Sequence, residues 1–385
     1  SRSLAPRAEV RVPAALALAW AALAASLPAP ILVLGNPPWV TTATLGAHDV
    51  APRPRARPAD VRGLDAGTGR SNFDVSEHLV GRLLEALAGR DAALAMVLKL
   101  AVARRLAERH ALGGEVRRID ARRWFGAAVD AAWVVARPGP RRWSEHVELD
   151  APAPARTWGV SEGRLHHDVV AFERTRALEG RASPAWRSGV KHDCALVLEL
   201  VRDGAGWRSR AGGPLTLEPD LVYPLLKGGD LARGAGPERA LLLPQDALGA
   251  PTDWIERALP ATWAYLDAHR ARFERRRSRV YEGRPPFAVF GVGPYALAPW
   301  KVAVAALYPD LSFRVVGPRG GRPTLLDDTC YFLPFETQAA AERTQRILTS
   351  EPARDFLRAR LFADAKRPVT KRLLDTLDLD RAAGA

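Results

Sequence analysis

The chain has 385 residues, of which 47% are hydrophobic and 26% are charged, and its formal net charge is +13 with a pI near 10.4. This composition is typical of globular proteins, and the length leaves room for two domains with full cores. The positive charge favours an anionic partner, most simply nucleic acid, although 50 arginines against six lysines also fit a GC-rich genome. Two distant cysteines, Cys194 and Cys330, argue against a disulfide framework and indicate a reducing cytoplasm.

The first predicted elements are a helix and a strand near the N-terminus. Residues 12–34 carry no charge over 23 positions, a pattern that could be mistaken for a membrane span or a signal peptide. The segment is mostly alanine and is interrupted by Pro13, Pro28 and Pro30, and alanine-rich runs insert weakly into membranes. An amphipathic or buried helix over about 14–26, followed by a strand at 31–34, explains it better.

The sequence Asn36-Pro37-Pro38-Trp39 follows that strand and the turn residue Gly35. In open α/β sheets, ligands bind beyond the carboxyl ends of the strands, where this tetrapeptide would lie. The prolines stiffen the turn, so the side-chain carbonyl of Asn36 and the backbone carbonyl of Pro37 can converge on the amino group of a base. Accepting both hydrogens would localise the lone pair of that nitrogen for in-line attack, and Trp39 offers a flat face to an extruded base. The alternative is a proline-rich loop with a packed tryptophan.

Residues 34–41 resemble the catalytic motif of the adenine-N6 DNA methyltransferases of type II and type IIG restriction-modification systems. The resemblance implies that Asn36 and Pro37 bind the target amino group, with Pro38 in the same motif, and that Trp39 stacks on a flipped adenine. Family members that methylate cytosine N4 usually begin the motif with serine, so Asn36 favours adenine. The resemblance further implies S-adenosylmethionine as cofactor, double-stranded DNA as substrate, and direct attack by N6 without a covalent enzyme intermediate.

Next in the chain, residues 41–70 are rich in arginine, proline and glycine, and could either clamp a DNA backbone or form a solvated loop. The pair Asn72-Phe73 then precedes a helical pattern of apolar residues. Asn72 could simply cap that helix. The resemblance instead places Asn72 and Phe73 at the border of the cofactor pocket.

A strand is predicted over 92–98, followed by a helix through about His110, and 115–119 with 129–136 look like a closing strand pair. Between these two strands lies Trp124-Phe125-Gly126, where the family has a second aromatic residue. The resemblance implies that Trp39 and Phe125 sandwich the adenine. The competing interpretation is a buried aromatic residue at a strand turn.

Prolines and glycines cluster at 137–157 and predict a domain boundary. We expect a partial methyltransferase catalytic domain over 1–145, a linker over 146–180 and a target-recognition domain over 181–385. The expected fold class is α/β, with the C-terminal half of a class I S-adenosylmethionine-dependent methyltransferase sheet followed by an α+β target-recognition domain. Five segments resemble, in order, the TaqI-like specificity domain of the same family: residues 187–194, 223–230, 327–332, 346–350 and 365–370.

Five basic residues in turns of the predicted target-recognition domain are candidate DNA contacts: Arg187, Lys191, Lys227, Lys366 and Arg367. Each is placed to reach a phosphate or a guanine edge, and each could also be plain surface charge. The six arginines of 270–279 suggest the exposed face of a helix. No metal site is predicted, because His166, His167, His192 and Cys194 lack a Cys-x-x-Cys pair.

The family's glycine-rich cofactor loop normally precedes the catalytic motif by many tens of residues, and only 35 residues stand before Asn36. We therefore expect a fragment of a longer enzyme or a truncated product, with poor cofactor binding of its own. The expected partners are an endonuclease or a missing N-terminal segment that completes the enzyme. The oligomeric state is not predicted. The alternative function is a non-catalytic DNA-binding remnant, and a more distant one is an unrelated basic membrane-associated protein.

Overall fold

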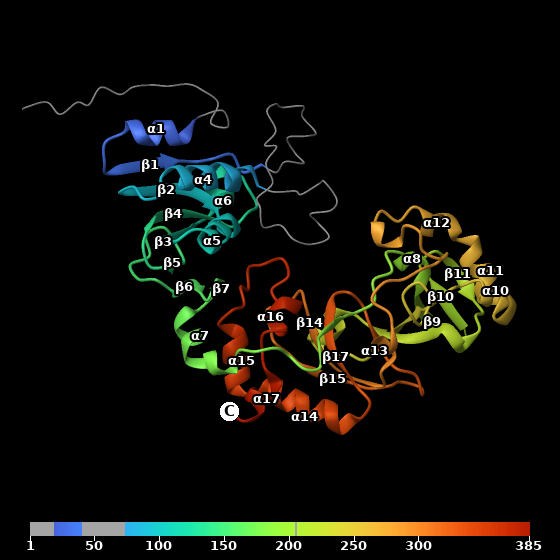
Figure 1. Cartoon of the computed structure of the whole chain (residues 1–385). Coiled ribbons are helices and arrows are strands. Elements are labelled where there is room, and N and C mark those ends of the chain that lie inside the picture. The colour runs from blue at the N-terminus through green and yellow to red at the C-terminus, as the bar shows by residue number, and fades with distance from the viewer. Residues whose placement is uncertain (1–18, 41–73, 205) are drawn as a thin grey trace, which may run out of the picture. The chain divides into compact units, whose positions relative to one another are not determined.

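The computed structural model describes residues 19–40, 74–204 and 206–385. These residues form two compact units that meet between Val170 and Ala171, and each unit is described by itself (Figure 1). The basic segment 41–70, and with it Asn72 and Phe73, lies outside the described residues, as does the start of the predicted helix over 14–26.

The first unit is built on a seven-stranded sheet with the order β1-β2-β4-β3-β5-β6-β7. β1 runs parallel to β2, with Gly35 beside Met96, and β2, β4 and β3 are antiparallel neighbours. The predicted strand at 31–34 and the predicted closing strand pair are therefore confirmed. The strands are β1 (Ile31–Gly35), β2 (Ala92–Lys99), β3 (Leu112–Ile119), β4 (Ala131–Pro138), β5 (Arg142–His146), β6 (Arg156–Ser161) and β7 (Arg164–His166).

The helices of the first unit follow from capping and apolar spacing. α4 begins after Asp74, whose side chain accepts a hydrogen bond from the backbone N–H of Ser76, and it buries Val75, Leu79 and Leu83. α5 packs against α4 and is the predicted helix that ends near His110. The helices are α1 (Trp20–Ser26), α4 (Val75–Ala86), α5 (Leu100–Arg109) and α6 (Ala121–Phe125).

The segment predicted as a linker, 146–180, differs from that expectation in its first part. β6 and β7 extend the first sheet, and Trp143 and Trp158 stack with ring centroids 5.1 Å apart and are buried. The prolines and glycines near 138–140 and 152–154 therefore mark turns between strands. The chain passes to the second unit inside α7 (Val169–Thr175).

The second unit holds two sheets, with the strand orders β11-β10-β9-β13-β12-β16 and β15-β14-β17-β8. Their strands are β8 (Arg187–Ser188), β9 (Glu199–Asp203), β10 (Gly206–Ser209), β11 (Gly212–Leu215), β12 (Val222–Leu226), β13 (Arg239–Leu242), β14 (Trp300–Ala305), β15 (Arg314–Val316), β16 (Leu325–Leu326) and β17 (Cys330–Phe335). Both units together give a mixed α/β structure.

The helices of the second unit are α8 (Ala195–Leu198), α9 (Gly228–Arg233), α10 (Trp254–Ala258), α11 (Pro260–Ala268), α12 (Arg270–Glu274), α13 (Pro294–Leu297), α14 (Gln338–Thr349), α15 (Glu351–Arg358), α16 (Lys371–Leu374) and α17 (Leu379–Ala383), with 3-10 turns at 176–178, 219–221 and 279–281. One core gathers around Trp186, Phe313 and Phe356, and another around Leu241 and Phe287. Within the described ranges, no helix is long and apolar enough to cross a bilayer.

Candidate active site

The tetrapeptide Asn36-Pro37-Pro38-Trp39 leaves the carboxyl end of β1, as the sequence predicts. Asn36 and Pro38 are exposed, whereas Pro37 and Trp39 are partly buried. The turn follows a parallel strand pair, β1 and β2, so it lies at the edge where α/β proteins place their ligands.

Lys99, at the last position of β2, anchors this turn by a hydrogen bond. Its Nζ donates to the backbone oxygen of Trp39 at 3.1 Å and lies 2.6 Å from Oδ2 of Asp74. The indole Nε1 of Trp39 donates to the backbone oxygen of Val97 at 3.3 Å, so the ring is anchored to the same strand. The position of Trp39 is therefore set by its backbone and by its side chain.

Asp74 connects the turn to helix α4. Its Oδ1 accepts from the backbone N–H of Ser76 at 3.1 Å and from the hydroxyl of Ser76 at 2.5 Å, while its Oδ2 faces Lys99. The N–H of Val75 donates to the backbone oxygen of Val40 at 2.9 Å. Sequence reasoning missed Lys99 and Asp74; the available signal was a lone lysine at the end of an apolar strand.

The fold brings Trp39 and Phe125 together, although they are distant in the sequence. Their ring centroids are 5.3 Å apart and their planes meet at 76°, an edge-to-face contact. α6 ends at Phe125, which is 47% exposed, and Gly126 closes the helix with a φ of 65°. A base between two parallel rings would need about 7 Å between them, twice the carbon–carbon contact distance. The rings must therefore separate before they can sandwich a base.

β1 lies at one edge of the described sheet and presents two exposed leucines. Leu32 and Leu34 are 61% and 64% exposed, although leucines in a strand of an α/β sheet are normally covered. In the described part of the chain, no glycine-rich strand–turn–helix unit lies beside β1. The same residues hold no cluster of three or more side chains that could bind a metal ion.

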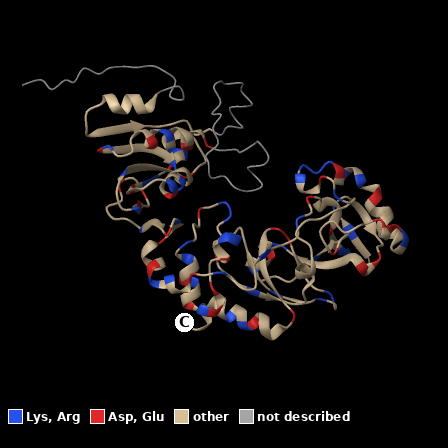
Figure 2. Ribbon diagram, in the orientation of Figure 1, with Lys and Arg blue, Asp and Glu red and all other residues tan. Residues whose placement is uncertain are grey.

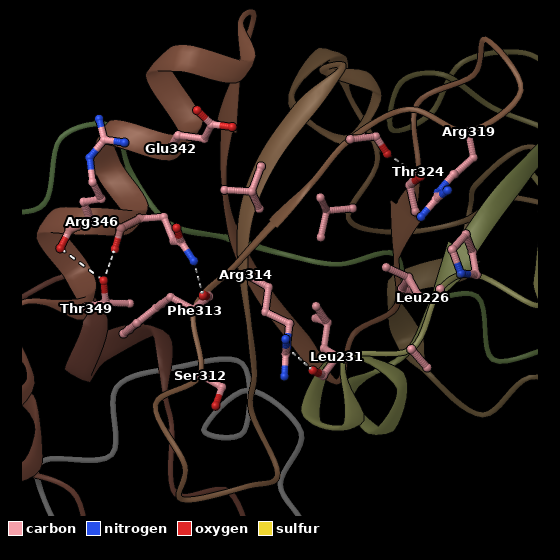
Figure 3. Close-up of a pocket in the computed structure, with 18 of the residues that line it drawn as sticks. Leu226, Leu231, Ser312, Phe313, Arg314, Arg319, Thr324, Glu342, Arg346 and Thr349 are labelled. Carbon is pink, nitrogen blue, oxygen red and sulfur yellow. Dashed lines mark hydrogen bonds between the residues drawn. The ribbon is translucent and has the colours of Figure 1, made fainter.

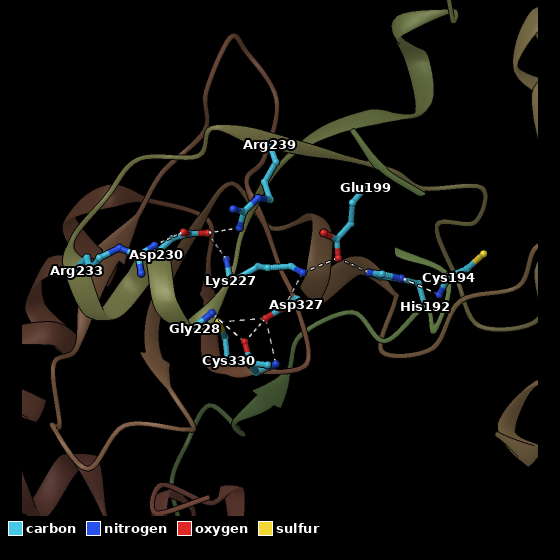
Figure 4. A network of polar contacts seen from close by, with 11 residues as sticks. His192, Cys194, Glu199, Lys227, Gly228, Asp230, Arg233, Arg239, Asp327 and Cys330 are labelled. Atoms are coloured by element: carbon cyan, nitrogen blue, oxygen red, sulfur yellow. Dashed lines mark hydrogen bonds and ion pairs between the residues drawn. The ribbon is translucent and has the colours of Figure 1, made fainter. Parts of the chain in front are cut away.

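Two of the five candidate DNA contacts form ion pairs inside the second unit. Nζ of Lys227 lies 2.6 Å from Oε1 of Glu199 and 4.0 Å from Asp327, and Nε2 of His192 lies 3.4 Å from the same Glu199 oxygen (Figure 4). Burial raises the pKa of Glu199, but the hydrogen bonds from His192 and Lys227 outweigh it and lower this pKa to about 2. Lys191 lies 3.4 Å from Asp193.

Of the other three candidates, Arg187 and Arg367 each contact a tyrosine, and Lys366 lies at the surface. The guanidinium of Arg187 lies 4.6 Å from the ring centroid of Tyr295, and Arg367 donates to the hydroxyl of Tyr331 at 3.3 Å. Lys366 is exposed. Lys366 and Arg187 form no ion pair with the residues described, which leaves their charges available to an anion.

The arginine run 270–279 is only partly an exposed helix face. α12 ends at Glu274, and Arg276 donates to the backbone oxygens of His192 and Ala288 at 3.0 and 2.5 Å. Its guanidinium also lies 3.6 Å from the ring centroid of Tyr281. Arg276 therefore contributes to packing within the unit.

Comparison with known proteins finds similarity to a curated methyltransferase and to solved structures. The chain is 34% identical over 374 residues to the type II methyltransferase M.NspV of Nostoc sp. (strain ATCC 29411 / PCC 7524), which covers 94% of this chain and 78% of the relative. Among solved structures, the type IIL restriction-modification enzyme MmeI in complex with DNA has a TM-score of 0.50 at 12% identity. That similarity covers 90% of this chain but only 46% of the MmeI chain, and it shows the fold alone. No family model matches.

Proposed function

Because the chain belongs to the type II methyltransferases of restriction-modification systems, we propose that it methylates adenine N6 at a specific site in double-stranded DNA. The observation that carries the proposal is the turn Asn36-Pro37-Pro38-Trp39 at the carboxyl end of β1, anchored by Lys99. This turn exposes the amide side chain of Asn36 three residues before the anchored ring of Trp39, and a base with an exocyclic amino group needs both kinds of side chain.

In the proposed reaction, the side-chain oxygen of Asn36 and the backbone oxygen of Pro37 accept the two hydrogens of N6. The lone pair of N6 is then less delocalised into the ring and points toward the methyl donor. S-adenosylmethionine supplies an activated methyl group when bound, and we assign Asn72 and Phe73 to the border of its pocket. The attack is direct, and no residue of the chain forms a covalent intermediate.

Trp39 and Phe125 are the proposed stacking residues for the flipped adenine. Their contact supports this assignment in part, because it brings the second aromatic ring to the motif residue Trp39, but the two rings touch each other. Trp39 is anchored to Val97, whereas Phe125 stands at the end of a short helix and is half exposed. We therefore assign the movement to Phe125, which opens a space for the base against a stationary Trp39.

DNA is the proposed partner, and the second unit is the proposed target-recognition domain, with a TaqI-like arrangement. Arg187 and Lys366 are the best supported of the five candidate contacts, because their charges are exposed. Lys191, Lys227 and Arg367 remain candidates, although each already has a partner inside the unit. The protein is proposed to act in the cytoplasm, together with an endonuclease.

A second candidate function is DNA binding without catalysis. Leu32 and Leu34 on β1 are exposed, and in the described part of the chain no glycine-rich strand–turn–helix unit lies beside this strand. On this alternative, the chain would recognise DNA and would not bind S-adenosylmethionine. Titration calorimetry separates the two, since micromolar cofactor binding to the 385-residue chain would rule out the alternative.

The decisive test is the substitution Asn36→Ala in the protein together with its native flanking sequence. Loss of one acceptor that acts mainly in the transition state should slow transfer of labelled methyl groups to duplex DNA by at least about 100-fold. DNA affinity should stay within about twofold, because phosphate contacts dominate that affinity. Unchanged methyl transfer would remove Asn36 from the assigned role.

A further inference from the structure

Two neighbouring hollows open on the surface of the second unit. One, of about 710 Å³, lies between the end of α9, strand β15 and helix α14, and Arg314, Arg319 and Arg346 are among its lining residues (Figure 3). The other, of about 860 Å³, lies beside β10, β12 and β13. Gly236, Pro237 and Arg319 line both hollows, so the two adjoin, and we treat them together as one groove.

Arginines dominate the charge of this groove. We name it the arginine groove, after its lining residues Arg202, Arg239, Arg314, Arg319, Arg322, Arg346 and Arg354, which share it with two glutamates, Glu238 and Glu342. Figure 2 shows the positive and negative residues of the chain along its ribbon. Seven guanidinium groups against two carboxylates leave an excess of positive charge in a concave surface, where field lines concentrate.

Few of these arginines are neutralised from inside the unit. Arg239 lies 3.1 Å from Asp230, but Arg314 and Arg322 donate to the backbone oxygens of Leu231 and Asp220, each at 2.7 Å. A carbonyl oxygen orients a guanidinium without removing its charge. Arg319, Arg346 and Arg354 make no ion pair with any described residue. The groove therefore holds several uncompensated cations that an anionic partner would stabilise.

Two arginines of the groove lie over aromatic rings. The guanidinium of Arg202 lies 4.1 Å from the ring centroid of Trp207, and that of Arg322 lies 5.1 Å from that of Tyr223. Stacking fixes the plane of a guanidinium and leaves its N–H groups pointing outward at its edge. These side chains consequently lose less conformational entropy when they bind a phosphate.

Two glycines that line the groove leave open space beside their backbone. At Gly320, where φ is 57°, an added Cβ would meet no atom within 4 Å, and at Gly236 the nearest atom would be Nη2 of Arg319 at 3.9 Å. An open groove lined by many arginines differs from a pocket for a small molecule, which is enclosed and mostly apolar. Its shape and its charge suit a polymer with regularly spaced negative charges.

We propose that the arginine groove binds the phosphodiester backbone of double-stranded DNA. The inference rests on the proposed function, in which DNA is the substrate, and it adds a binding surface to the five basic residues that the sequence suggested. Phosphate contacts of this kind fix the register of a protein on DNA and carry no sequence information themselves. Recognition of the target base pairs then falls to other residues of the second unit.

The test compares three variants of the full chain by fluorescence anisotropy with a labelled DNA duplex between 50 and 200 mM salt. The double substitution Arg319→Ala with Arg346→Ala removes two uncompensated charges and no hydrogen bond within the groove. Two lost phosphate contacts should weaken binding by on the order of tenfold each at 0.1 M salt and reduce the slope of log K against log salt by about two. Arg343→Ala is the matched control, because this exposed arginine lies on the same helix, α14, outside the groove.

The third variant, Arg319→Lys with Arg346→Lys, keeps both charges and should keep most of the affinity, since lysine contacts a phosphate as a point charge. Thermal unfolding checks that all variants are folded. If the alanine variant binds DNA like the parent chain with the same salt slope, the groove is not the DNA surface and the proposed function still stands. If the lysine variant loses as much affinity as the alanine variant, backbone binding is the wrong assignment. If the parent chain binds no duplex at any salt concentration, the groove and the DNA substrate both fail.

Discussion

Lys99 shows how one partly buried cation can organise the proposed catalytic turn. Its ammonium group lies between the backbone oxygen of Trp39 and the carboxylate of Asp74, and Asp74 in turn caps α4. The contact joins three segments, the motif turn, strand β2 and helix α4, at a single point. The position of Asn36 relative to the rest of the site therefore depends on a residue outside the motif.

We expect Lys99→Ala to destabilise the chain by about 1–3 kcal/mol, because it removes charge-assisted hydrogen bonds and leaves the buried Asp74 carboxylate without its cation. The measurement is the urea midpoint at neutral pH. Arg82→Ala is the control, since Arg82 and Glu85 form a pair 3.9 Å apart in which both side chains are more than half exposed. Its effect should stay within about 0.5 kcal/mol. Equal midpoints for both variants would show that Lys99 does not support the turn.

At the scale of single residues, the sequence predicted that the tetrapeptide follows a strand, because the apolar run and the turn-forming glycine are adjacent to it in the chain. It did not predict the link between Lys99 and Asp74, which exists only because β1 and β2 pair in one register. It also placed Lys227 in a turn that could reach DNA, whereas folding brings this lysine to Glu199. Contacts between residues distant in the chain depend on topology, which a single sequence does not display.

The strands of the second unit are joined by a charged network as well as by apolar packing. Glu199 begins β9, Lys227 follows β12, and Asp327 follows β16, so their ion pairs connect three strands of one sheet (Figure 4). Nδ1 of His192 accepts the backbone N–H of Cys194, which leaves Nε2 as the donor toward Glu199. Glu199 is therefore stabilised as a carboxylate by two donors.

This network should make the second unit sensitive to acid. The pKa of Glu199 in the folded chain is about 2, below its ordinary value of 4.5, so the unfolded chain takes up the proton first as pH falls. The stabilisation is fully present above about pH 4.5 and is lost as pH falls toward 2. Glu199→Gln should lower the free energy of unfolding by on the order of 3 kcal/mol at pH 7, and the gap to the parent chain should shrink by pH 3.

Urea titrations at pH 7 and pH 3 measure both quantities. Asp203→Asn is the control, because Asp203 ends the same strand and pairs with Arg208 at the surface. A gap between Glu199→Gln and the parent chain that is the same at both pH values would show that the Glu199 carboxylate is not the stabilising species.

Elements with a clear apolar periodicity were predicted from the sequence. Short strands that form only by pairing with neighbouring strands were not. The helix at 75–86 and the strand at 92–99 follow from apolar periodicity, but the residue that caps the helix is Asp74 and not the candidate Asn72. β6 and β7 were expected to belong to a linker, because short strands between prolines resemble loops until Trp158 is seen to stack on Trp143. The short strands of the second unit posed the same difficulty.

At the scale of the whole molecule, the chain divides into a unit with the proposed catalytic turn and a unit with the arginine groove. The three described cores of the second unit contain only residues from Ala171 onward. They draw on both sheets and on the C-terminal helices α14, α15 and α17. The second unit therefore has the packed interior of an independently folding domain.

We expect the fragment 168–385, which keeps all of α7, to fold cooperatively and to bind duplex DNA with the salt dependence of the full chain. It should transfer no methyl groups, because Asn36 is absent. Circular dichroism during heating and anisotropy with a labelled duplex measure these properties, and the fragment with Arg319→Ala and Arg346→Ala is the control. A fragment that unfolds without cooperativity would show that residues before α7 complete its core. A folded fragment that binds no DNA, beside a full chain that does, would place the DNA affinity in the first unit and would also contradict the proposed role of the arginine groove.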